Sequence, residues 1–512
     1  MLIAMTGATG SMGRESVKNI IANTSAKLRL LIEDNKAGRR AAEQLRKKYR
    51  GRVSCFFGSI TESNDCDKLV RGSDVVFHLA AVIPPRADSF PELADAVNFG
   101  GTVNMVRAAE DDGKVKFVYI SSVAVYGHRT FAHPWGRVGD PLIPSAFDAY
   151  GNSKVRAERV VLESKIRDFA VLRQTGILHP DIMTKNLRDG LVFHTPWNVP
   201  IEWITARDSG RLMGKIAAAE ECGENGGFWG RVYDIGGGEK CRQTGYEMYD
   251  SGFKLIGGST KSFFRPRDNC ARNFHCLWFS DSDILEDMFS FRSEDLNDFW
   301  RNMADRHKFY VLGKAVPKKL LRNGVIEALY TNPNSPTYWA EHGDIARVTA
   351  FFGGQEAYER ITKDWEKYGL VCERPGYEKM KNQTFAERSG MPVFLNHGYD
   401  ESKPDGELSI EDMREAARFR GGECLSDSME KGDLRTKLLW KCAEGHIFKS
   451  SPFAVLKAGH WCPECCETKD VWRFDEIAKK SPFFAQVWYD SHGRRENFVY
   501  RLADGKAIME VK

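Results

Sequence analysis

The sequence predicts an α/β protein with a doubly wound parallel sheet, followed by a mainly helical region and a small metal-binding domain. Over roughly the first 260 residues, short apolar segments alternate with amphipathic helical ones, which is typical of parallel strands covered by helices on both faces. A glycine-rich loop joins the first apolar segment to the first helical one. Cysteines gather near the C-terminus, and this cluster predicts the metal-binding domain.

Six apolar segments are the strand candidates, and they read LIAMTG, LRLLIE, VSCFFG, VVFHLAA, FVYISS and FAVLRQTG. Segments such as SVKNIIANTS and AGRRAAEQLRKKY between them have helical periodicity. We expect a dinucleotide-binding domain with substrate-binding insertions over residues 1–262 and a helical cap or accessory region over 263–405. A zinc ribbon is expected over 406–470, with a tail over 471–512 that packs on it.

Length and composition limit the classes of protein to consider. A chain of 512 residues is too long for one ordinary core. The net charge of +4 gives no reason to expect a nucleic acid or a membrane as partner. No apolar run is long enough to span a bilayer, and no signal peptide is recognisable at the N-terminus. We therefore expect a cytoplasmic protein, in which clustered cysteines indicate metal binding rather than disulfides.

The loop TGATGSMG has the glycine spacing of a dinucleotide-binding turn. Gly7 permits a tight turn, Gly10 lets the backbone approach a pyrophosphate, and Gly13 permits close packing of helix and strand. The N-terminus of the following helix offers free N–H groups to the phosphates. An ordinary glycine turn is the alternative. The predicted cofactor contacts in this loop are Gly7, Thr9, Gly10, Ser11, Met12 and Gly13.

The residue at the end of the second strand bears on the choice of cofactor. Glu33 can accept hydrogen bonds from the ribose hydroxyls, and its carboxylate repels a 2′-phosphate. This favours NAD over NADP. Lys36, Arg39 and Arg40 follow closely and could offset the repulsion, so NADP stays an alternative. A solvated helix face is the other interpretation of these three residues.

Three residues have the types and order needed for acid–base chemistry. Ser122 ends the strand FVYISS, and Tyr150 and Lys154 lie four residues apart in DAYGNSK, which places both on one helix face. A neighbouring ammonium lowers the pKa of a tyrosine and makes it usable as an acid or base. We therefore predict Ser122, Tyr150 and Lys154 as the catalytic residues.

Residues 1 to about 260 resemble the extended short-chain dehydrogenases/reductases of the NAD-dependent epimerase/dehydratase type, which have a Rossmann-type sheet. The resemblance rests on TGATGSMG, HLAA, VNFGGTVN, SSVAVYG, YGNSK, LRQTG and YDIGGG. It implies that Ala80 and Ala81 line the adenine ribose and that Asn98 supports the active-site helix. It also implies that Lys154 binds the nicotinamide ribose and that the segment from Gln174 to Gly176 borders the nicotinamide.

The sequence departs from the family pattern at three places. Adenine contacts are implied at Ser59 and Ile60, but Ser59 stands where the family usually has an aspartate. Gln174 and Thr175 replace a frequent proline. Where dehydratases usually carry an Asp-Glu pair, this chain has Val123 and Ala124, so simple sugar dehydration is not expected.

The resemblance implies reversible hydride transfer at a secondary alcohol or ketone, with Tyr150 as acid or base. We also expect a small-molecule substrate and a homo-oligomer. A redox-neutral epimerase of a sugar nucleotide is the alternative. A cofactor-sensing regulator that binds nucleic acid through the ribbon is a third, less favoured, hypothesis. Substrate contacts are expected between residues 176 and 270, where each candidate also has a structural interpretation: His179, His194, Trp197, Asn198 and Arg207.

Two other groups of residues have mainly structural interpretations. His78 lies in an apolar strand and is expected to be a core histidine. The aromatic residues between about 274 and 310 occur at helix-like intervals, which favours a packed core. A lid that closes over the nicotinamide is the alternative for this region.

The C-terminal cysteines have the spacing of a zinc site. Cys442 and His446 in WKCAEGH, and Cys462 and Cys465 in WCPEC, supply four ligands that suit tetrahedral zinc. Cys424 is a fifth candidate that could replace His446. The pattern GGxCLS…WxCxxGH…WCPxC resembles a zinc ribbon over about residues 420–468. Because protein ligands fill every position, the zinc is expected to be structural. A packing or oligomerisation module is favoured over a nucleic-acid reader.

Overall fold

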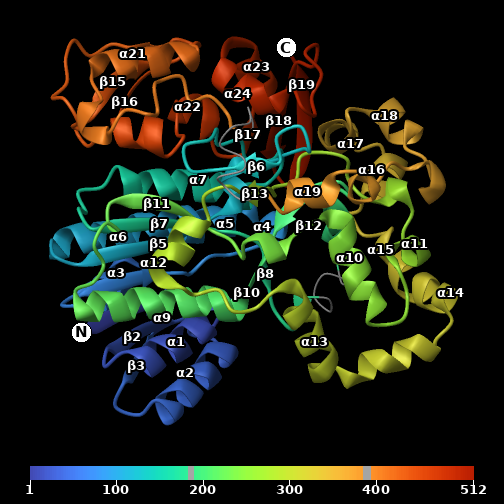
Figure 1. Ribbon diagram of the computed structural model, residues 1–512, viewed down its shortest axis with the longest axis horizontal. Coiled ribbons are helices and arrows are strands. Elements are labelled where there is room, and N and C mark those ends of the chain that lie inside the picture. The colour runs from blue at the N-terminus through green and yellow to red at the C-terminus, as the bar shows by residue number, and fades with distance from the viewer. Residues whose placement is uncertain (183–188, 384–393) are drawn as a thin grey trace.

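The computed structural model describes residues 1–182, 189–383 and 394–512 (Figure 1). Parts of the expected substrate-contact segment (183–188) and of the expected cap region (384–393) lie outside the described residues. Among the described helices, every one is too short or too polar to cross a lipid bilayer.

A seven-stranded parallel sheet forms the first domain, with the order β11-β7-β5-β4-β1-β2-β3. Its strands are β1 (Leu2–Thr6), β2 (Lys27–Ile32), β3 (Val53–Phe57), β4 (Val75–His78), β5 (Lys116–Ser122), β7 (Phe169–Gln174) and β11 (Arg231–Ile235). The six predicted strands are confirmed, and β11 is the seventh. The strand order reverses between β1 and β4, and ligands of doubly wound sheets bind at such a switch point. The Rossmann-type fold is therefore confirmed.

Helices cover both faces of this sheet, and the side chains of the strands alternate between two cores. On one face, α1 (Ser11–Asn23) packs along α9 (Ala206–Cys222), and Val118 and Ile120 of β5 point to it. On the other face lie α3 (Ser63–Val70), α6 (Gly101–Asp112) and α7 (Ala149–Leu162), which receive Phe117 and Tyr119. α2 (Lys36–Lys48) follows β2. The alternation explains the nearly continuous apolar sequence of these strands.

The middle of the chain forms short helices beside the sheet, on the right of Figure 1. Most of its aromatic side chains are buried, and Trp197 and Trp365 lie 5.2 Å apart between ring centroids in one such core. The packed-core interpretation is wrong for Phe309, which is 57% exposed. The main helices here are α10 (Gly245–Lys254), α11 (Thr260–Phe263), α13 (Leu296–Arg306), α14 (Lys318–Leu321), α16 (Pro336–Glu341), α17 (Ile345–Phe352), α18 (Gln355–Arg360) and α19 (Tyr377–Lys381). α12 (Asp283–Phe289) instead packs against α9 and β11 of the first domain.

Residues 406–470, hereafter the ribbon, form an antiparallel three-stranded sheet of β14 (Glu423–Cys424), β15 (Leu438–Lys441) and β16 (Ile447–Ser450). Within the ribbon, the sheet is preceded by α21 (Ile410–Phe419), where Ser409 and Asp412 form a capping box. The ribbon ends in α22 (Pro463–Cys466). In Figure 1 it lies over α7, in orange and red.

The C-terminal tail forms a second antiparallel sheet of β17 (Val471–Trp472), β18 (Phe498–Ala503) and β19 (Lys506–Val511). α23 (Phe474–Lys480) and α24 (Pro482–Trp488) lie between the first two strands. The tail contacts the ribbon, where Lys480 pairs with Glu444 at 2.7 Å. It also contacts the middle region, where Glu496 pairs with Arg272 at 2.7 Å.

Candidate functional site

The glycine loop after β1 has the backbone geometry that its spacing predicts. Gly7 has a φ of +73°, and a Cβ there would lie 2.7 Å from the backbone nitrogen of Ala80. A Cβ on Gly13 would lie 2.1 Å from the Gly7 carbonyl oxygen, whereas the nearest atom to one on Gly10 is 3.4 Å away. The fold therefore requires glycine at Gly7 and Gly13, but not at Gly10.

The N-terminus of α1 suits a phosphate group. Gly10 is its N-cap and has no side chain to cap the helix, so the first N–H groups of Ser11 and Met12 are open to an anion. Arg14 donates from Nε to the Thr9 carbonyl at 2.7 Å and fixes the loop. These features fit the pyrophosphate of a dinucleotide.

A hydrogen-bonded chain fixes the loop after β4, where Ala80 and Ala81 lie. The Thr6 hydroxyl accepts from the backbone N–H groups of Leu79 and Ala80, both at 3.1 Å. His78 contacts Thr6 Oγ1 through Nδ1 at 2.8 Å and Thr102 Oγ1 through Nε2 at 3.0 Å. Burial lowers the pKa of His78 to about 3. His78 is therefore a core histidine, as expected.

The predicted ribose and adenine contacts lie after β2 and β3. Glu33 follows β2 and accepts from Asn35 Nδ2 at 3.0 Å. Arg39, which was a candidate to offset the charge of Glu33, pairs instead with Asp34 at 2.6 Å.

The Ser59 backbone N–H donates to the Asp65 carboxylate at 3.1 Å. Asp65 of α3 thus reaches this turn, although Ser59 occupies the sequence position at which the family usually has an aspartate. The side chain of the neighbouring Ile60 is buried, and it would meet a Cβ on Gly101 of α6 at 2.5 Å.

Ser122, Tyr150 and Lys154 come together at the carboxyl end of β5. α7 begins at Ala149, and Asp148 caps it by accepting from the Gly151 N–H at 2.7 Å. The side chains of Ser122 and Tyr150 are hydrogen-bonded. Lys154 Nζ donates to the Ile120 carbonyl at 2.5 Å and lies 4.4 Å from the ring centroid of Tyr119.

The electrostatics of this group differ from the prediction. Burial raises the pKa of Tyr150 to about 12, opposed by the hydrogen bond with Ser122. Burial lowers the pKa of Lys154 to about 7, opposed by the Glu158 carboxylate. The predicted lowering of the tyrosine pKa by Lys154 is wrong for this structure, because desolvation dominates and the ammonium points to a backbone carbonyl.

Asn98 holds α7 against the loop after β4. It is 1% exposed; it accepts from the Val82 N–H at 2.7 Å and donates to the Val82 carbonyl at 2.9 Å. It also donates to Ser153 Oγ at 3.0 Å. This is the supporting position that the resemblance implied.

The segment after β7 lies against an aromatic ring that the sequence did not single out. Gln174 is buried, and its amide donates to the Thr175 carbonyl at 3.1 Å. A Cβ on Gly176 would lie 2.5 Å from the ring of Trp203. Trp203 belongs to no recognised motif, so only the fold reveals that it borders this segment.

Of the five residues expected to contact the substrate, four form hydrogen bonds or ion pairs with residues far away in the sequence. His194 contacts the Asn334 carbonyl at 2.8 Å, and Trp197 donates to the Pro266 carbonyl at 2.8 Å. Asn198 donates to the Gly369 carbonyl at 2.9 Å, and Arg207 pairs with Glu294 at 2.7 Å. In the fifth, His179 Nδ1 accepts from the Asp181 N–H at 3.2 Å. These contacts favour the structural interpretation.

The middle region reaches the start of α7, which no motif predicted. His275 Nδ1 lies 3.0 Å from the Asp148 carboxylate. The neighbouring Phe147 has a φ of +62°, which is uncommon for a bulky residue and is found at functional sites. Arg347 of α17 lies 5.7 Å from its ring centroid.

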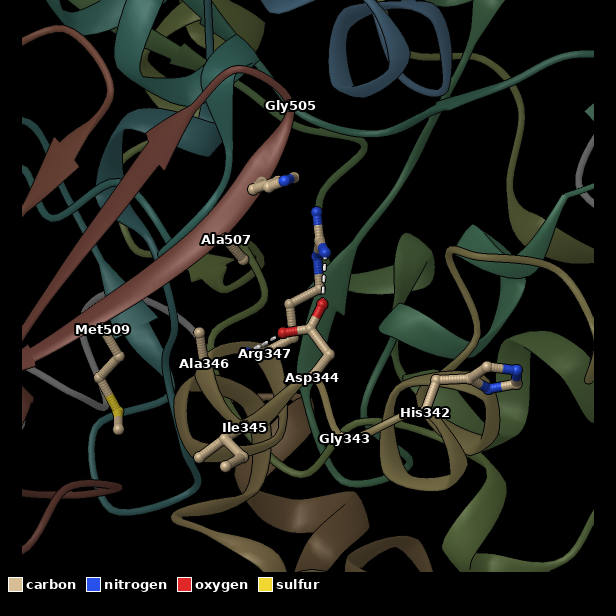
Figure 2. Close-up of a pocket in the computed structure, with 10 residues that line it drawn as sticks. His342, Gly343, Asp344, Ile345, Ala346, Arg347, Gly505, Ala507 and Met509 are labelled. Atoms are coloured by element: carbon tan, nitrogen blue, oxygen red, sulfur yellow. Dashed lines mark hydrogen bonds and ion pairs between the residues drawn. The ribbon is translucent and has the colours of Figure 1, made fainter.

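A separate hollow of about 570 Å³ lies between the start of α17 and the β18–β19 hairpin (Figure 2). Asp344 and Arg347 form an ion pair of 2.5 Å within it. None of the predicted site residues lines it; its lining is His342, Gly343, Asp344, Ile345, Ala346, Arg347, Gly505, Lys506, Ala507 and Met509.

The predicted metal ligands converge in the ribbon. The ligand atoms of Cys442, His446, Cys462 and Cys465 all lie within 4.8 Å of one another. The sulfurs of Cys442 and Cys465 are 3.8 Å apart, and His446 Nδ1 lies 3.2 Å from the Cys465 sulfur. Tetrahedral zinc with Zn–S bonds of about 2.3 Å holds two sulfurs about 3.8 Å apart. The donor set and its spacing therefore fit zinc.

Cys424 is not a member of this group. It lies on β14 opposite Trp440 of β15, whereas Cys442 and His446 occupy the turn between β15 and β16. The interpretation in which Cys424 replaces His446 is therefore wrong for this structure.

3 beta-hydroxysteroid dehydrogenase type 7 of Homo sapiens is 29% identical over 203 residues, which cover 37% of this chain and 54% of that protein. D-erythronate dehydrogenase of Haemophilus influenzae is 25% identical over 175 residues, 33% of this chain and 51% of that protein. The chain thus spans about half the length of these relatives.

Among solved structures, dTDP-glucose 4,6-dehydratase DesIV from Streptomyces venezuelae, with NAD and TYD bound, matches with a TM-score of 0.49 and 21% identity. The match covers 61% of this chain and 100% of that one. The family model described as the NAD dependent epimerase/dehydratase family matches residues 3–173. Over this N-terminal third, the chain is therefore similar to the NAD dependent epimerase/dehydratase family.

Proposed function

We propose that the chain is an NAD-dependent oxidoreductase that transfers hydride reversibly between the cofactor and a secondary alcohol or ketone. The observation that carries the proposal is the meeting of Ser122, Tyr150 and Lys154 at the carboxyl end of β5, on the same sheet edge as the glycine loop. A serine and a tyrosine in contact can transfer a proton at a carbinol oxygen, and Lys154 lies one helical turn after Tyr150 on the same helix face.

In this proposal the glycine loop holds the pyrophosphate and Glu33 the adenosine ribose, while NAD supplies the carbon that accepts or gives hydride. In the reductive direction, Tyr150 gives its hydroxyl proton to the ketone oxygen as hydride reaches the carbonyl carbon. Ser122 donates a hydrogen bond to the same oxygen, and Lys154 binds the nicotinamide ribose. The raised pKa of Tyr150 keeps its proton in place at neutral pH, which supports the role of acid.

Two features bear on the kind of reaction. Val123 and Ala124 are 4% and 0% exposed, and Val123 belongs to an apolar cluster, so the position of the Asp-Glu pair of dehydratases offers no acid. This speaks against dehydration. Epimerisation needs only oxidation, rotation and reduction, so a redox-neutral epimerase acting on a sugar nucleotide is the second candidate.

The cofactor preference also belongs to this proposal. Glu33 accepts from Asn35 at 3.0 Å, and the nearby Arg39 is paired with Asp34. The Glu33 side chain therefore lies at the predicted ribose position, and Arg39, one of three candidates to receive a 2′-phosphate, is already paired with Asp34. We expect tighter binding of NADH than of NADPH, measured by fluorescence titration of the full chain.

The test of the function is net turnover. Purified chain is incubated with NAD⁺ or NADH and with hydroxysteroids, aldonic acids and sugar nucleotides, and nicotinamide absorbance is followed. The proposal expects net NADH formation or consumption with one of these classes. Tyr150→Phe should still bind NADH but lose turnover by about 10²-fold or more. Epimer interconversion without net NADH change would establish the second candidate, and turnover that survives in Tyr150→Phe would refute both.

A further inference from the structure

α7 has two partners. Its inner side carries Tyr150 and Lys154 against the sheet, and its outer side lies under the ribbon (Figure 1). Arg159 makes the central contact with the ribbon. It donates from Nε and from a terminal nitrogen to the two Glu467 carboxylate oxygens, both at 2.6 Å, and to Ser450 Oγ at 3.1 Å. Such bidentate pairing fixes orientation as well as distance.

The ribbon also holds α7 near both of its ends. Close to the N-terminal end, Asn152 donates to the Thr468 carbonyl at 2.7 Å. At the C-terminal end, Glu163 accepts from the Ser450 hydroxyl at 2.7 Å and from the Ser451 N–H at 2.9 Å. α7 is thus fixed to the ribbon at three positions along its length.

Glu158 connects this interface with the candidate active site. It lies one helical turn after Lys154, on the same face of α7, and its side chain is fully buried. Its carboxylate is 2.5 Å from Arg173 and accepts from the Ser121 hydroxyl at 2.6 Å. Ser121 precedes Ser122, so Glu158 contacts β5 directly beside one predicted catalytic residue and lies one turn from another.

His460 of the ribbon completes the connection. Its Nε2 lies 3.2 Å from Glu158 Oε1, and its Nδ1 lies 2.7 Å from Glu467 Oε1. Arg173, Glu158, His460, Glu467 and Arg159 therefore form one continuous chain of contacts, and the side chains of its first three members are fully buried. A buried ionic chain is weak evidence for stability but can specify one arrangement.

The predicted zinc ligands lie within this same stretch. His460 is two residues before Cys462, and Glu467 is two residues after Cys465. The turn that brings Cys462 and Cys465 to one point thus also sets the positions of His460 and Glu467. Metal binding would fix the backbone on both sides of the interface residues.

We propose that the ribbon is a positioning element of the active site. Its zinc-held turn fixes Glu158 through His460, and Glu158 in turn fixes Lys154 of α7 and Ser121 of β5. His460 and Glu158 are then positioning residues. The effect on catalysis rests on the proposed function, whereas the effect on α7 itself does not.

The first test uses variants of the full chain. His460→Ala should keep its zinc but lose at least about tenfold in kcat and in NADH affinity, with the substrate KM within about twofold of wild type, because a small displacement of catalytic groups is costly. His460→Gln, whose amide carries two N–H donors, should recover most of the loss. Lys441→Ala is the control, since Lys441 pairs with Glu423 on the exposed side of the ribbon. Wild-type kcat and NADH affinity in zinc-loaded His460→Ala would overturn the proposal.

The second test needs neither a variant nor a substrate. Zinc is removed from the full chain with a chelator, and amide hydrogen exchange is compared for peptides from α7 and from α1. The proposal expects faster exchange in α7 with little change in α1. Unchanged exchange in α7, or an equal increase in both helices, would overturn it. If wild-type chain shows no nicotinamide turnover while α7 responds to zinc, the proposed function fails, and the part of the inference that concerns the position of α7 stands.

Discussion

The Asn98 amide donates to Ser153 Oγ at 3.0 Å and joins the segment after β4 to the helix that carries Tyr150 and Lys154. Ser153 in turn donates to the Tyr150 carbonyl at 2.8 Å. Asn98 also bonds both backbone groups of Val82. One buried side chain thus sets the relative position of the Ala80–Ala81 loop and the start of α7.

Asn98→Ala should destabilise the chain by about 1–3 kcal/mol, because it leaves buried backbone groups of Val82 without partners. Denaturation by urea at neutral pH measures the change. Asn104→Ala is the matched control, since the Asn104 side chain is only half-buried and donates one bond, to the Ile60 carbonyl at 2.9 Å. Equal effects of the two substitutions would contradict the special role of Asn98.

The glycines of the first loop should separate folding from cofactor binding. Gly10→Ala should fold normally, since its φ of −70° suits alanine and no atom lies closer than 3.4 Å to the new Cβ. It should nevertheless bind NADH at least about tenfold more weakly, because the methyl group occupies the approach of the pyrophosphate. Gly13→Ala should lose thermal stability as well, because its Cβ would lie 2.1 Å from the Gly7 carbonyl oxygen. Thermal melts and NADH titrations distinguish the two, and tight NADH binding by Gly10→Ala would contradict the assignment of the loop.

Cys442→Ser and Cys424→Ser should differ in zinc content. Cys442 belongs to the four-residue group, whereas Cys424 lies outside it on β14. We expect one zinc per chain in wild type and in Cys424→Ser, and loss of zinc with a lower melting temperature in Cys442→Ser. Elemental analysis of the purified chains gives the answer. Retention of zinc by Cys442→Ser would exclude this ligand set.

Candidate functional residues could be predicted from the sequence where they lie close together in the chain or at the ends of predicted strands. The glycine loop, the Tyr150–Lys154 pair and the two zinc-binding turns are local patterns. Ser122 was predictable because the apolar segment before it marks where β5 ends. The parallel sheet then brings these strand ends to one edge, which is a property of the fold class.

Contacts between distant segments could not be predicted in this way. Trp203 against Gly176, His275 beside Asp148 and the His460–Glu158 contact belong to no motif, and only the tertiary fold brings them together. The pKa of Tyr150 was predicted in the wrong direction for the same reason. The spacing of Tyr150 and Lys154 indicates a shared helix face, but it contains no information about burial, which dominates both pKa values.

The buried ammonium of Lys154 should make the stability of the chain depend on pH. Its pKa is about 7 in the folded chain, lowered by burial against the opposing charge of Glu158, and 10.5 is the ordinary value. Between these two values the unfolded chain binds more protons than the folded chain, so the free energy of unfolding rises with pH. Well below pH 7, where lysine is protonated in both states, the full cost of burying the charge is present.

Lys154→Met removes the titrating amino group but keeps an unbranched apolar side chain at this position. We expect this variant to be more stable than wild type at about pH 6.5, and the difference between the two to shrink as the pH rises towards about 10. Urea denaturation of both chains across this range measures it. Tyr150, whose pKa burial raises to about 12, is present in both chains, so its contribution cancels in the difference between them. A difference between variant and wild type that stays constant from pH 6.5 to 10 would mean that the Lys154 ammonium titrates in the folded chain as it does in water, and that α7 does not bury it.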